Sequence, residues 1–318
     1  MHNALNKAIS IKSMNKIFSV FIFFHFSLIL GCNDLNEKTV KVDFIQKSEN
    51  SNERDGNDSV APLRVAVAAI ISPRETYTYY NELFKYISKK INRPIVFEQR
   101  KTYSEVNDML INQTVDIAFV CTGAYIRNKK YCDVLVVPVC KNLPYYQGYI
   151  IVRKNSAFKS LKDLKGKSFA FTDPLSNTGK LYPELRVKKI SNMKAEDFFS
   201  KIIYTNAHDM SIELVSKSLV DGASVNSLIY DYLASTNPER IENLRIIEKS
   251  EYFGIPPVVT SKGINKELRK KLEELFLNVN DDPDGQIILR KLLIDKFIIT
   301  GDTLYNNVCS EYKESNNE

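Results

Sequence analysis

The sequence predicts an α/β protein of two lobes, each built on a mostly parallel β-sheet, with two crossing segments that act as hinges between them. Short apolar runs rich in β-branched residues alternate with amphipathic helical segments over residues 63–139, and the alternation restarts after residue 153. Such alternation is typical of a parallel sheet covered by helices on both faces. Two extended stretches, 148–153 and the one around Pro256-Pro257, connect the units. Two connections of this kind allow hinged closure.

The N-terminal 61 residues are predicted to export and tether the protein. Within residues 1–31, three lysines and no acidic residue accompany an apolar run over 17–30, which is the pattern of a secretory signal starting at Met1 or Met14. The run is short for a bilayer span, and Ile29-Leu30-Gly31-Cys32 resembles the lipobox of bacterial lipoproteins. We therefore expect acylation of Cys32 and a flexible polar linker over 32–61. An ordinary cleaved signal, or an N-terminal anchor helix, is the alternative.

The composition of the remaining chain argues against nucleic acid and metal as partners. Beyond residue 31 the chain carries 41 basic against 38 acidic residues, dispersed along its length, which is too small a bias for nucleic-acid binding. Four cysteines follow Cys32, and their spacing matches no zinc pattern. We expect no cofactor and no metal. A disulfide among these cysteines and four buried thiols both remain open: Cys121, Cys132, Cys140 and Cys309.

Residues 62–148 are predicted to form the first part of lobe 1. An apolar run over 63–70 predicts a buried strand, and Ser72-Pro73 then places an N-cap residue before a proline at the first helical position. Apolar residues at helical spacing continue this helix to about residue 90. The elements expected after it are a strand from 95, a helix over 104–112, a strand over 115–120, a third helix and a strand over 134–139.

Residues 149–250 are predicted to form lobe 2, and residues 251–318 return to lobe 1 and end in helices. The lobe 2 helices are expected at 161–164, 177–189, 194–199, 209–217 and 227–233, and its strands at 168–172, 202–204, 222–225 and 244–247. From residue 265 the chain reads as helical, with a break at 282–285. Ligands of such sheets bind beyond the carboxyl ends of the strands, so the strand-to-helix turns are the candidate site.

The most informative turn is Thr172-Asp173-Pro174-Leu175-Ser176-Asn177-Thr178-Gly179, which leaves a strand and enters a helix. A helix start has unsatisfied N–H donors and a partial positive charge, so it binds oxyanions without a cation. Ser176 and Thr178 add hydroxyl donors, Asn177 adds an amide, and Gly179 allows a close approach to the backbone. The alternative is that Ser176 merely caps the helix.

Three further turns carry possible ligand donors. His208 follows the strand that ends at residue 204 and could donate to an oxyanion, although a lone histidine is more often structural. Ser72 and Tyr77 lie at the start of the first helix, and Thr122 and Tyr125 follow the strand over 115–120. Each turn alone is a weak signal, but four turns with donors in two facing lobes make a stronger one.

Six collinear segments make the chain resemble the periplasmic phosphonate-, phosphite- and phosphate-binding proteins of ABC importers. The resemblance covers about residues 63–297 and implies a type II periplasmic-binding fold. The segments are SPRETY (72–77), FVCTGAY (119–125), TDPLSNTG (172–179), the His-Asp step at 208–209, VDGASVNSLIYD (220–231) and FGIPPVV (253–259).

The resemblance implies roles for individual residues. In the family a Ser/Thr run at the start of the lobe 2 helix holds the phosphonyl oxygens, and here the matching positions are Ser176, Asn177 and Thr178. Tyrosines that close over the ligand match Tyr77 and Tyr125, and the family's histidine matches His208. Asn226 stands at or near a position where members often carry an aspartate for the ligand's amine, which puts selection for a charged amine in doubt. Asn177 also departs from the Ser/Thr pattern.

These features together predict a non-enzymatic receptor. It would capture a phosphonate, phosphite or phosphate between its lobes as a monomer and pass it to an ABC permease and ATPase. It would be held by lipid in the periplasm or on the outer face of the cell envelope. One alternative is that the same two-lobed fold serves as an anion sensor or adaptor. The other is that it binds a sulfonate or another organic anion. An enzyme with Ser176 and His208 as nucleophile and base is disfavoured, because the G-x-S-x-G elbow is absent.

Overall fold

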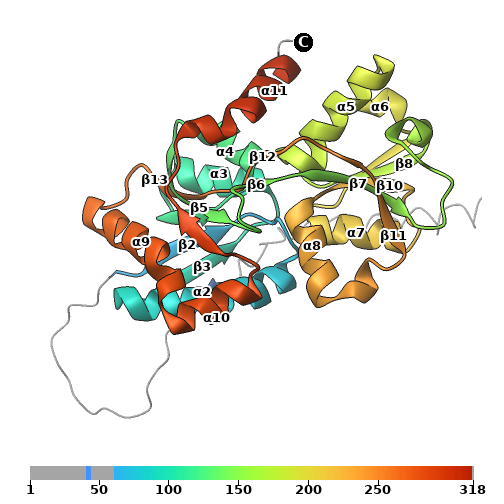
Figure 1. The fold of residues 1–318 in the computed structure, drawn as a ribbon. Helices are drawn as coiled ribbons and strands as arrows, with labels where there is room; N and C mark the ends of the chain where they lie inside the picture. Colours follow the sequence, from blue (N-terminus) through green and yellow to red (C-terminus); the bar gives the residue numbers. More distant parts are fainter. Residues whose placement is uncertain (1–40, 44–60, 317–318) are drawn as a thin grey trace, which may run out of the picture. The chain divides into compact units, whose positions relative to one another are not determined.

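A computed structural model, drawn in Figure 1, describes residues 41–43 and 61–316. The predicted signal, the predicted acylation site Cys32 and most of the linker lie outside these residues. In the part of the chain that is described, no helix has both the length and the apolarity needed to cross a bilayer.

Lobe 1 is built on a seven-stranded sheet with the strand order β1-β3-β2-β4-β13-β5-β14. Its strands are β1 (Lys41–Asp43), β2 (Leu63–Val67), β3 (Ile95–Gln99), β4 (Ile117–Phe119), β5 (Cys132–Val139), β13 (Val258–Ser261) and β14 (Lys296–Ile298). Its helices are α2 (Pro73–Ile91), α3 (Tyr103–Ile111), α4 (Thr122–Asn128), α9 (Lys266–Asn278) and α10 (Pro283–Lys291).

Lobe 2 is built on a five-stranded sheet with the order β11-β7-β10-β8-β9. Its strands are β7 (Gly148–Arg153), β8 (Ser168–Phe171), β9 (Lys201–Tyr204), β10 (Gly222–Asn226) and β11 (Leu244–Lys249). Its helices are α5 (Tyr182–Ser191), α6 (Ala195–Phe198), α7 (His208–Ser216) and α8 (Ser227–Thr236), with short 3₁₀ turns at Leu161–Leu164 and Pro238–Arg240. The predicted helix over 177–189 is a π-helical turn, Asn177–Leu181, that runs into α5.

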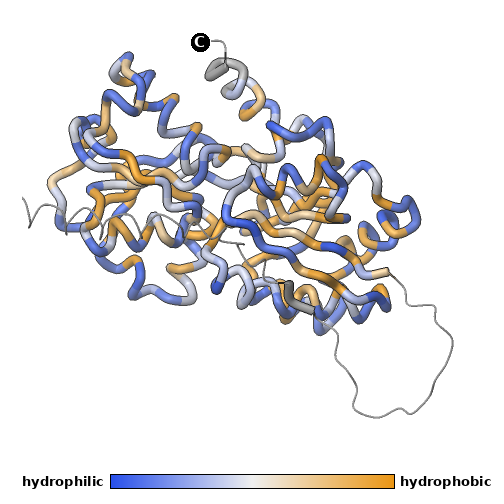
Figure 2. Tube along the Cα trace, turned by 180° about the vertical axis from the view of Figure 1, so that it is seen from behind, coloured by the Kyte–Doolittle hydropathy of each residue, from blue (hydrophilic) through white to orange (hydrophobic). Residues whose placement is uncertain are grey.

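Both lobes have three layers, because side chains on a strand alternate between the two faces of a sheet. In β2, Leu63, Val65 and Val67 pack toward α2, α9 and α10, whereas Ala66 packs toward α3 and α4. Lobe 2 divides its core in the same way between the α5/α6 face and the α7/α8 face. The hydrophobic segments accordingly concentrate on the strands (Figure 2).

The prediction of mostly parallel sheets was wrong. Parallel pairing is confined to β3-β2-β4 and to β10-β8-β9. The segments that cross between the lobes enter each sheet from the opposite end, so β7 runs antiparallel to β10 and β11, and β13 runs antiparallel to β4 and β5. The sequence reading had missed β13 and β14, because both are short strands in the returning segment.

The two crossing segments meet in a small hinge sheet. β6 (Tyr145–Tyr146) pairs antiparallel with β12 (Phe253–Gly254). The C-terminal helix α11 (Asn306–Asn316) packs on α4 in lobe 1 and on the π-helical turn in lobe 2. The prediction of two crossing segments is therefore confirmed, but the paired hinge strands lie just before the predicted stretches, since 148–153 is strand β7 of the lobe 2 sheet.

Hydrogen bonds across the interlobe gap show that the lobes are closed on each other. The Asp173 carboxylate of lobe 2 accepts from the backbone N–H of Tyr103, at the start of α3, at 3.0 Å. The Asp209 carboxylate accepts from the N–H of Ser72, at the N-cap of α2, at 2.8 Å. Each aspartate thus satisfies a donor at a helix start of the opposite lobe.

Candidate anion-binding site

The site is centred on the turn from Thr172 to Leu181. The Ser176 carbonyl accepts from the N–H groups of Lys180 and Leu181 at 3.2 and 3.0 Å, which produces the π-helical turn. The Ser176 Oγ accepts from the Gly179 N–H at 3.0 Å, so this serine does cap the turn. π-Helical turns often occur at functional sites. Here the turn carries Asn177 and Thr178 into a position where both are fully buried.

Gly179 is required by the geometry of the turn itself. A Cβ at this position would lie 2.5 Å from Thr172 Oγ1 and 2.8 Å from Ser176 Oγ. Since its N–H is bonded to Ser176, the glycine supports the turn by making room for neighbouring side chains.

Several buried polar atoms of this region have no hydrogen-bond partner within the described chain. They are Asn177 Oδ1, Thr178 Oγ1, His208 Nε2 and Tyr103 Oη. A buried polar atom left without a partner costs about 1–3 kcal/mol, and native proteins keep few of them. Such a concentration around one turn indicates a polar ligand that supplies the missing partners.

His208 has a defined tautomer. Its Nδ1 lies 3.1 Å from the backbone nitrogen of Asn226, which can only donate, and 3.0 Å from Thr172 Oγ1. Nδ1 is therefore the acceptor, and Nε2 carries the proton. Burial lowers the pKa of His208 to about 3, so the ring is a neutral donor whose Nε2–H has no partner among the described residues.

Two tyrosines that the sequence reading did not select complete the site. Tyr146 Oη accepts from Asn177 Nδ2 at 3.4 Å, and the Tyr103 hydroxyl lies near Ser176 without a hydrogen-bond partner in the described chain. Burial raises the pKa of both phenols, so they stay protonated and can donate. A capping box between Thr102 and Glu105 places Tyr103 at the first helical position, and this T-x-x-E pattern was a usable signal. For Tyr146 no local signal existed.

Lobe 1 contacts the turn through the start of α4. The Cys121 thiol lies near the backbone of Asn177, and burial raises its pKa. Gly123 lies against Leu175 and Asn177 so closely that it has no room for a side chain. Thr122 Oγ1 donates to the Gly254 carbonyl in the hinge at 2.8 Å, so its hydroxyl ties α4 to the hinge.

The remaining predicted residues have different surroundings. The Tyr125 hydroxyl donates to Asp302 at 3.0 Å, and its ring packs on Tyr305 within lobe 1. Tyr77 lies on α2 with 40% of its surface exposed. Ser72 makes its interlobe bond through the backbone, and its side chain does not cap α2.

Asn226 supports the site by holding the His208 ring and by capping α8. Its N–H donates to His208 Nδ1, and its Oδ1 caps α8 by accepting from the Leu228 N–H at 2.8 Å. The structure therefore brings together the lobe 2 predictions with Thr122, whereas the tyrosines beside the turn are Tyr103 of lobe 1 and Tyr146 of the hinge strand β6.

No lysine or arginine is among these site residues. The nearby Asp173 carboxylate is buried, its pKa is raised by that burial, and it accepts from the N–H groups of Leu175 and Tyr103. Glu184 pairs with Lys180 at 2.8 Å. An anion here would be held by neutral N–H and O–H donors, which suits an oxyanion with several acceptor oxygens.

The described residues contain no group of His, Cys, Asp and Glu side chains that could hold a metal ion. No disulfide joins the four cysteines that were left open, because all of them are free thiols: Cys121, Cys132, Cys140 and Cys309.

Comparisons with known proteins identify the family of the chain. A profile of the family described as "ABC transporter, phosphonate, periplasmic substrate-binding protein" matches residues 65–305. The phosphonates-binding periplasmic protein of Escherichia coli is 30% identical over 153 residues, which span 47% of this chain and 45% of that protein. The match thus spans less than half of this relative. A phosphate-import protein of Mycolicibacterium smegmatis is 25% identical over 230 residues, 68% of this chain and 71% of that protein.

Two solved structures share the fold. A binding-protein component of an ABC phosphonate transporter from Pseudomonas aeruginosa superposes with a TM-score of 0.75 at 21% identity, over 79% of this chain and 85% of that one. A Prochlorococcus marinus protein in complex with methylphosphonate superposes with a TM-score of 0.73 at 18% identity, over 80% and 98%. The two-lobed periplasmic-binding fold predicted from the sequence is confirmed.

Proposed function

The chain belongs to the family of periplasmic substrate-binding proteins of ABC phosphonate transporters, and on this premise we propose that it captures a small phosphorus oxyanion by closing its lobes. It then presents the anion to an ABC permease and its ATPase. The names of its relatives support a phosphonate, phosphite or phosphate as the ligand. We also propose that acylation of Cys32 holds the receptor at the membrane surface from the periplasmic side.

The observation that carries the proposal is the set of buried, unpartnered polar atoms around the turn. Thr178 Oγ1, His208 Nε2 and Tyr103 Oη can each donate to an oxygen of the anion. Asn177 Oδ1 is an acceptor, and it suits a protonated phosphorus oxygen. A sulfonate carries no such proton, so this atom favours a phosphorus acid over a sulfonate.

An enzymatic role for Ser176 and His208 has no support in this geometry. His208 Nδ1 is occupied by Asn226 and Thr172, and Nε2 carries the proton, so the ring offers no free basic nitrogen. Ser176 Oγ caps the turn. Ser176 therefore stabilises the turn, and His208 can donate its Nε2 proton to a ligand.

Thr178→Val tests the proposal. A hydrogen bond to a charged group contributes about 1.5–3 kcal/mol, so loss of this hydroxyl should weaken binding by about tenfold to a hundredfold. Because Thr178 Oγ1 has no protein partner, the variant should unfold at the same temperature as the wild type or slightly higher. Calorimetric titration with phosphite, methylphosphonate, aminoethylphosphonate, phosphate, sulfate and methanesulfonate gives the affinities.

Thr260→Val is the matched control. Thr260 is also fully buried with an unpartnered Oγ1, but it lies on β13 in the lobe 1 sheet. It should leave binding unchanged. If no phosphorus anion binds the wild type, or if Thr178→Val and Thr260→Val bind equally well, the proposed function of this turn is wrong.

A further inference from the structure

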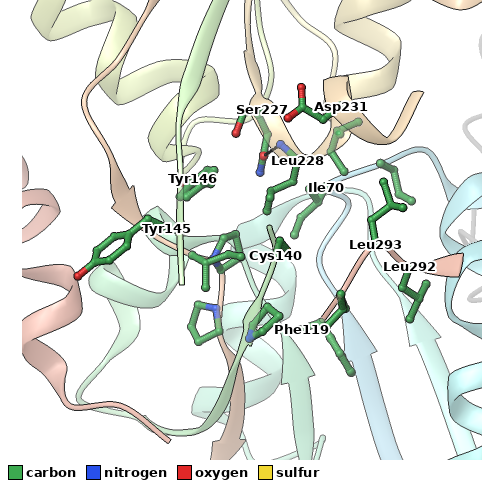
Figure 3. Close-up of a pocket in the computed structure, with 18 of the residues that line it drawn as sticks. Ile70, Phe119, Cys140, Tyr145, Tyr146, Ser227, Leu228, Asp231, Leu292 and Leu293 are labelled. Atoms are coloured by element: carbon green, nitrogen blue, oxygen red, sulfur yellow. Dashed lines mark hydrogen bonds between the residues drawn. The ribbon is translucent and has the colours of Figure 1, made fainter. Parts of the chain in front are cut away.

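A second feature lies between the lobes beside the anion site: a cavity of about 280 Å³, here called the hinge cavity. Figure 3 shows its walls, with Phe119, Leu292 and Leu293 from lobe 1 and Ser227 and Leu228 from α8 of lobe 2. The hinge strand β6 closes one side with Tyr145 and Tyr146. Its volume is near the lower end of the range for small-molecule sites.

The hinge cavity shares two lining residues with the anion site. Tyr146 and Asn226 line it, and each also contacts the anion site, Tyr146 through Asn177 at 3.4 Å and Asn226 through His208 at 3.1 Å. Ile70, a third lining residue, accepts from the His208 backbone N–H at 3.0 Å. These three residues therefore adjoin both the anion site and the hinge cavity.

The walls of the hinge cavity are mainly aliphatic and aromatic. Tyr80, on the lobe 1 side, packs its ring against Phe119 and Phe84 at centroid distances of 4.9 and 5.7 Å. The hydroxyl of its neighbour Tyr79 donates to the Leu292 carbonyl at 2.8 Å. The hydroxyl of Tyr79 is thus satisfied within lobe 1, and the Tyr80 ring is held by aromatic neighbours.

The charged side chains of the lining are paired with other groups of the protein. Lys141 and Asp231 form an ion pair at 2.6 Å, and the Lys141 side chain is 74% exposed. Lys249 lies over the Tyr149 ring at 5.0 Å. The Asn226 side-chain oxygen caps α8. A ligand ammonium in this cavity would lose its hydration, and the Asp231 carboxylate of the lining is already paired with Lys141. Binding of an ammonium group here would therefore be costly.

We propose that the ligand is a phosphonate whose carbon substituent is apolar and larger than methyl. This inference rests on the proposed function: the phosphonyl group binds Asn177, Thr178 and His208, and the substituent fills the hinge cavity. With about 30 Å³ for each water-sized group, the space holds roughly six to nine carbon-sized groups. Burial of each methylene should tighten binding by about fourfold until the cavity is full.

A ligand series tests the inference. We expect calorimetric titration to give at least tenfold tighter binding for butyl-, hexyl- or phenylphosphonate than for methylphosphonate. Propylphosphonate and 2-aminoethylphosphonate are matched in size and differ by a methyl in place of an ammonium, and the propyl compound should bind at least tenfold more tightly. If methylphosphonate binds as tightly as the longer members, or the aminoethyl compound binds more tightly than the propyl one, the inference is overturned while the proposed function stands. If phosphate or phosphite binds but no phosphonate does, the inference fails and the proposed function stands, and if no phosphorus anion binds, both fail.

A cavity-filling variant tests the location. Cys140 lines the hinge cavity beside Tyr79 and Tyr80, so Cys140→Trp should weaken hexylphosphonate more than tenfold and methylphosphonate less than threefold. Cys309→Trp is the matched control, because Cys309 is equally half-buried but lies on α11 outside the lining. Cys140→Leu repeats the test with a smaller side chain should the tryptophan unfold the protein. If hexylphosphonate binds both Cys140 variants as tightly as the wild type, the substituent does not occupy this cavity.

Discussion

Gly123→Ala is expected to separate lobe closure from folding. Gly123 is the second residue of α4 in lobe 1, where the Leu175–Asn177 part of the lobe 2 turn docks. A methyl group there would overlap the Leu175 carbonyl oxygen and lie 2.9 Å from the Asn177 nitrogen and 2.6 Å from the Tyr312 hydroxyl. The tyrosine tip can move, but the two backbone atoms can move only if the whole turn withdraws.

The size of the effect follows from where the overlap occurs. Overpacking a well-packed contact costs about 1–3 kcal/mol, and the overlap with the turn exists only when the lobes meet. We therefore expect ligand affinity to fall by about fivefold to 150-fold. Within α4 itself alanine is favoured over glycine by up to about 1 kcal/mol, so the unliganded variant should unfold at the wild-type temperature or above it.

Calorimetric titration with the tightest-binding phosphorus anion, together with thermal unfolding without ligand, measures both quantities. Gly301→Ala is the matched control, because a Cβ there would meet nothing nearer than Thr303 Oγ1 at 3.8 Å. Binding by folded Gly123→Ala within twofold of the wild type would refute the view that this glycine permits docking of the turn.

Three further outcomes follow from the structure. Burial lowers the pKa of His208 from 6.5 to about 3, so between these values the unfolded chain takes up a proton that the native ring does not. This residue should therefore lower the free energy of unfolding by on the order of 4 kcal/mol as pH falls from 6.5 to 3. Urea titrations over this pH range should show a correspondingly smaller fall in the free energy of unfolding for His208→Gln than for the wild type. Asp209→Ala removes the interlobe acceptor for the Ser72 N–H and should weaken ligand binding about fivefold, whereas Asp209→Asn keeps an acceptor and should lose less; equal binding by both would contradict this role. Since Cys121, Cys132, Cys140 and Cys309 are free, reductant should leave the unfolding temperature unchanged, and a fall of several degrees would reveal a disulfide.

Local sequence was sufficient for many of the elements and for the centre of the site. The strand β2 followed from a β-rich apolar run, and the start of α2 from Ser72-Pro73. The turn at Ser176–Thr178 was identified by donors that follow a strand and open a helix. These features depend on residues a few positions apart, so the order of residues carries them directly.

The antiparallel strands, Tyr146 and the hinge cavity required the tertiary structure. β13 joins the first sheet from more than 100 residues beyond its partner β5, and nothing near Val258 in the chain determines the direction of that pairing. Tyr146 reaches Asn177 only because the hinge strands place it there. Tyr125 was predicted to face the ligand, yet its hydroxyl binds Asp302, 177 residues away.

The sequence by itself therefore determined the family resemblance, the α/β alternation and the candidate anion-binding turn. Hydrogen bonding within a turn and the periodicity of apolar residues are short-range properties, and the chain order contains them. Only the tertiary structure decided which tyrosines surround the turn, which N–H groups each aspartate satisfies and where a ligand can extend. These depend on contacts between distant segments, whose positions are set by the packing of two cores and by the closure of one lobe on the other.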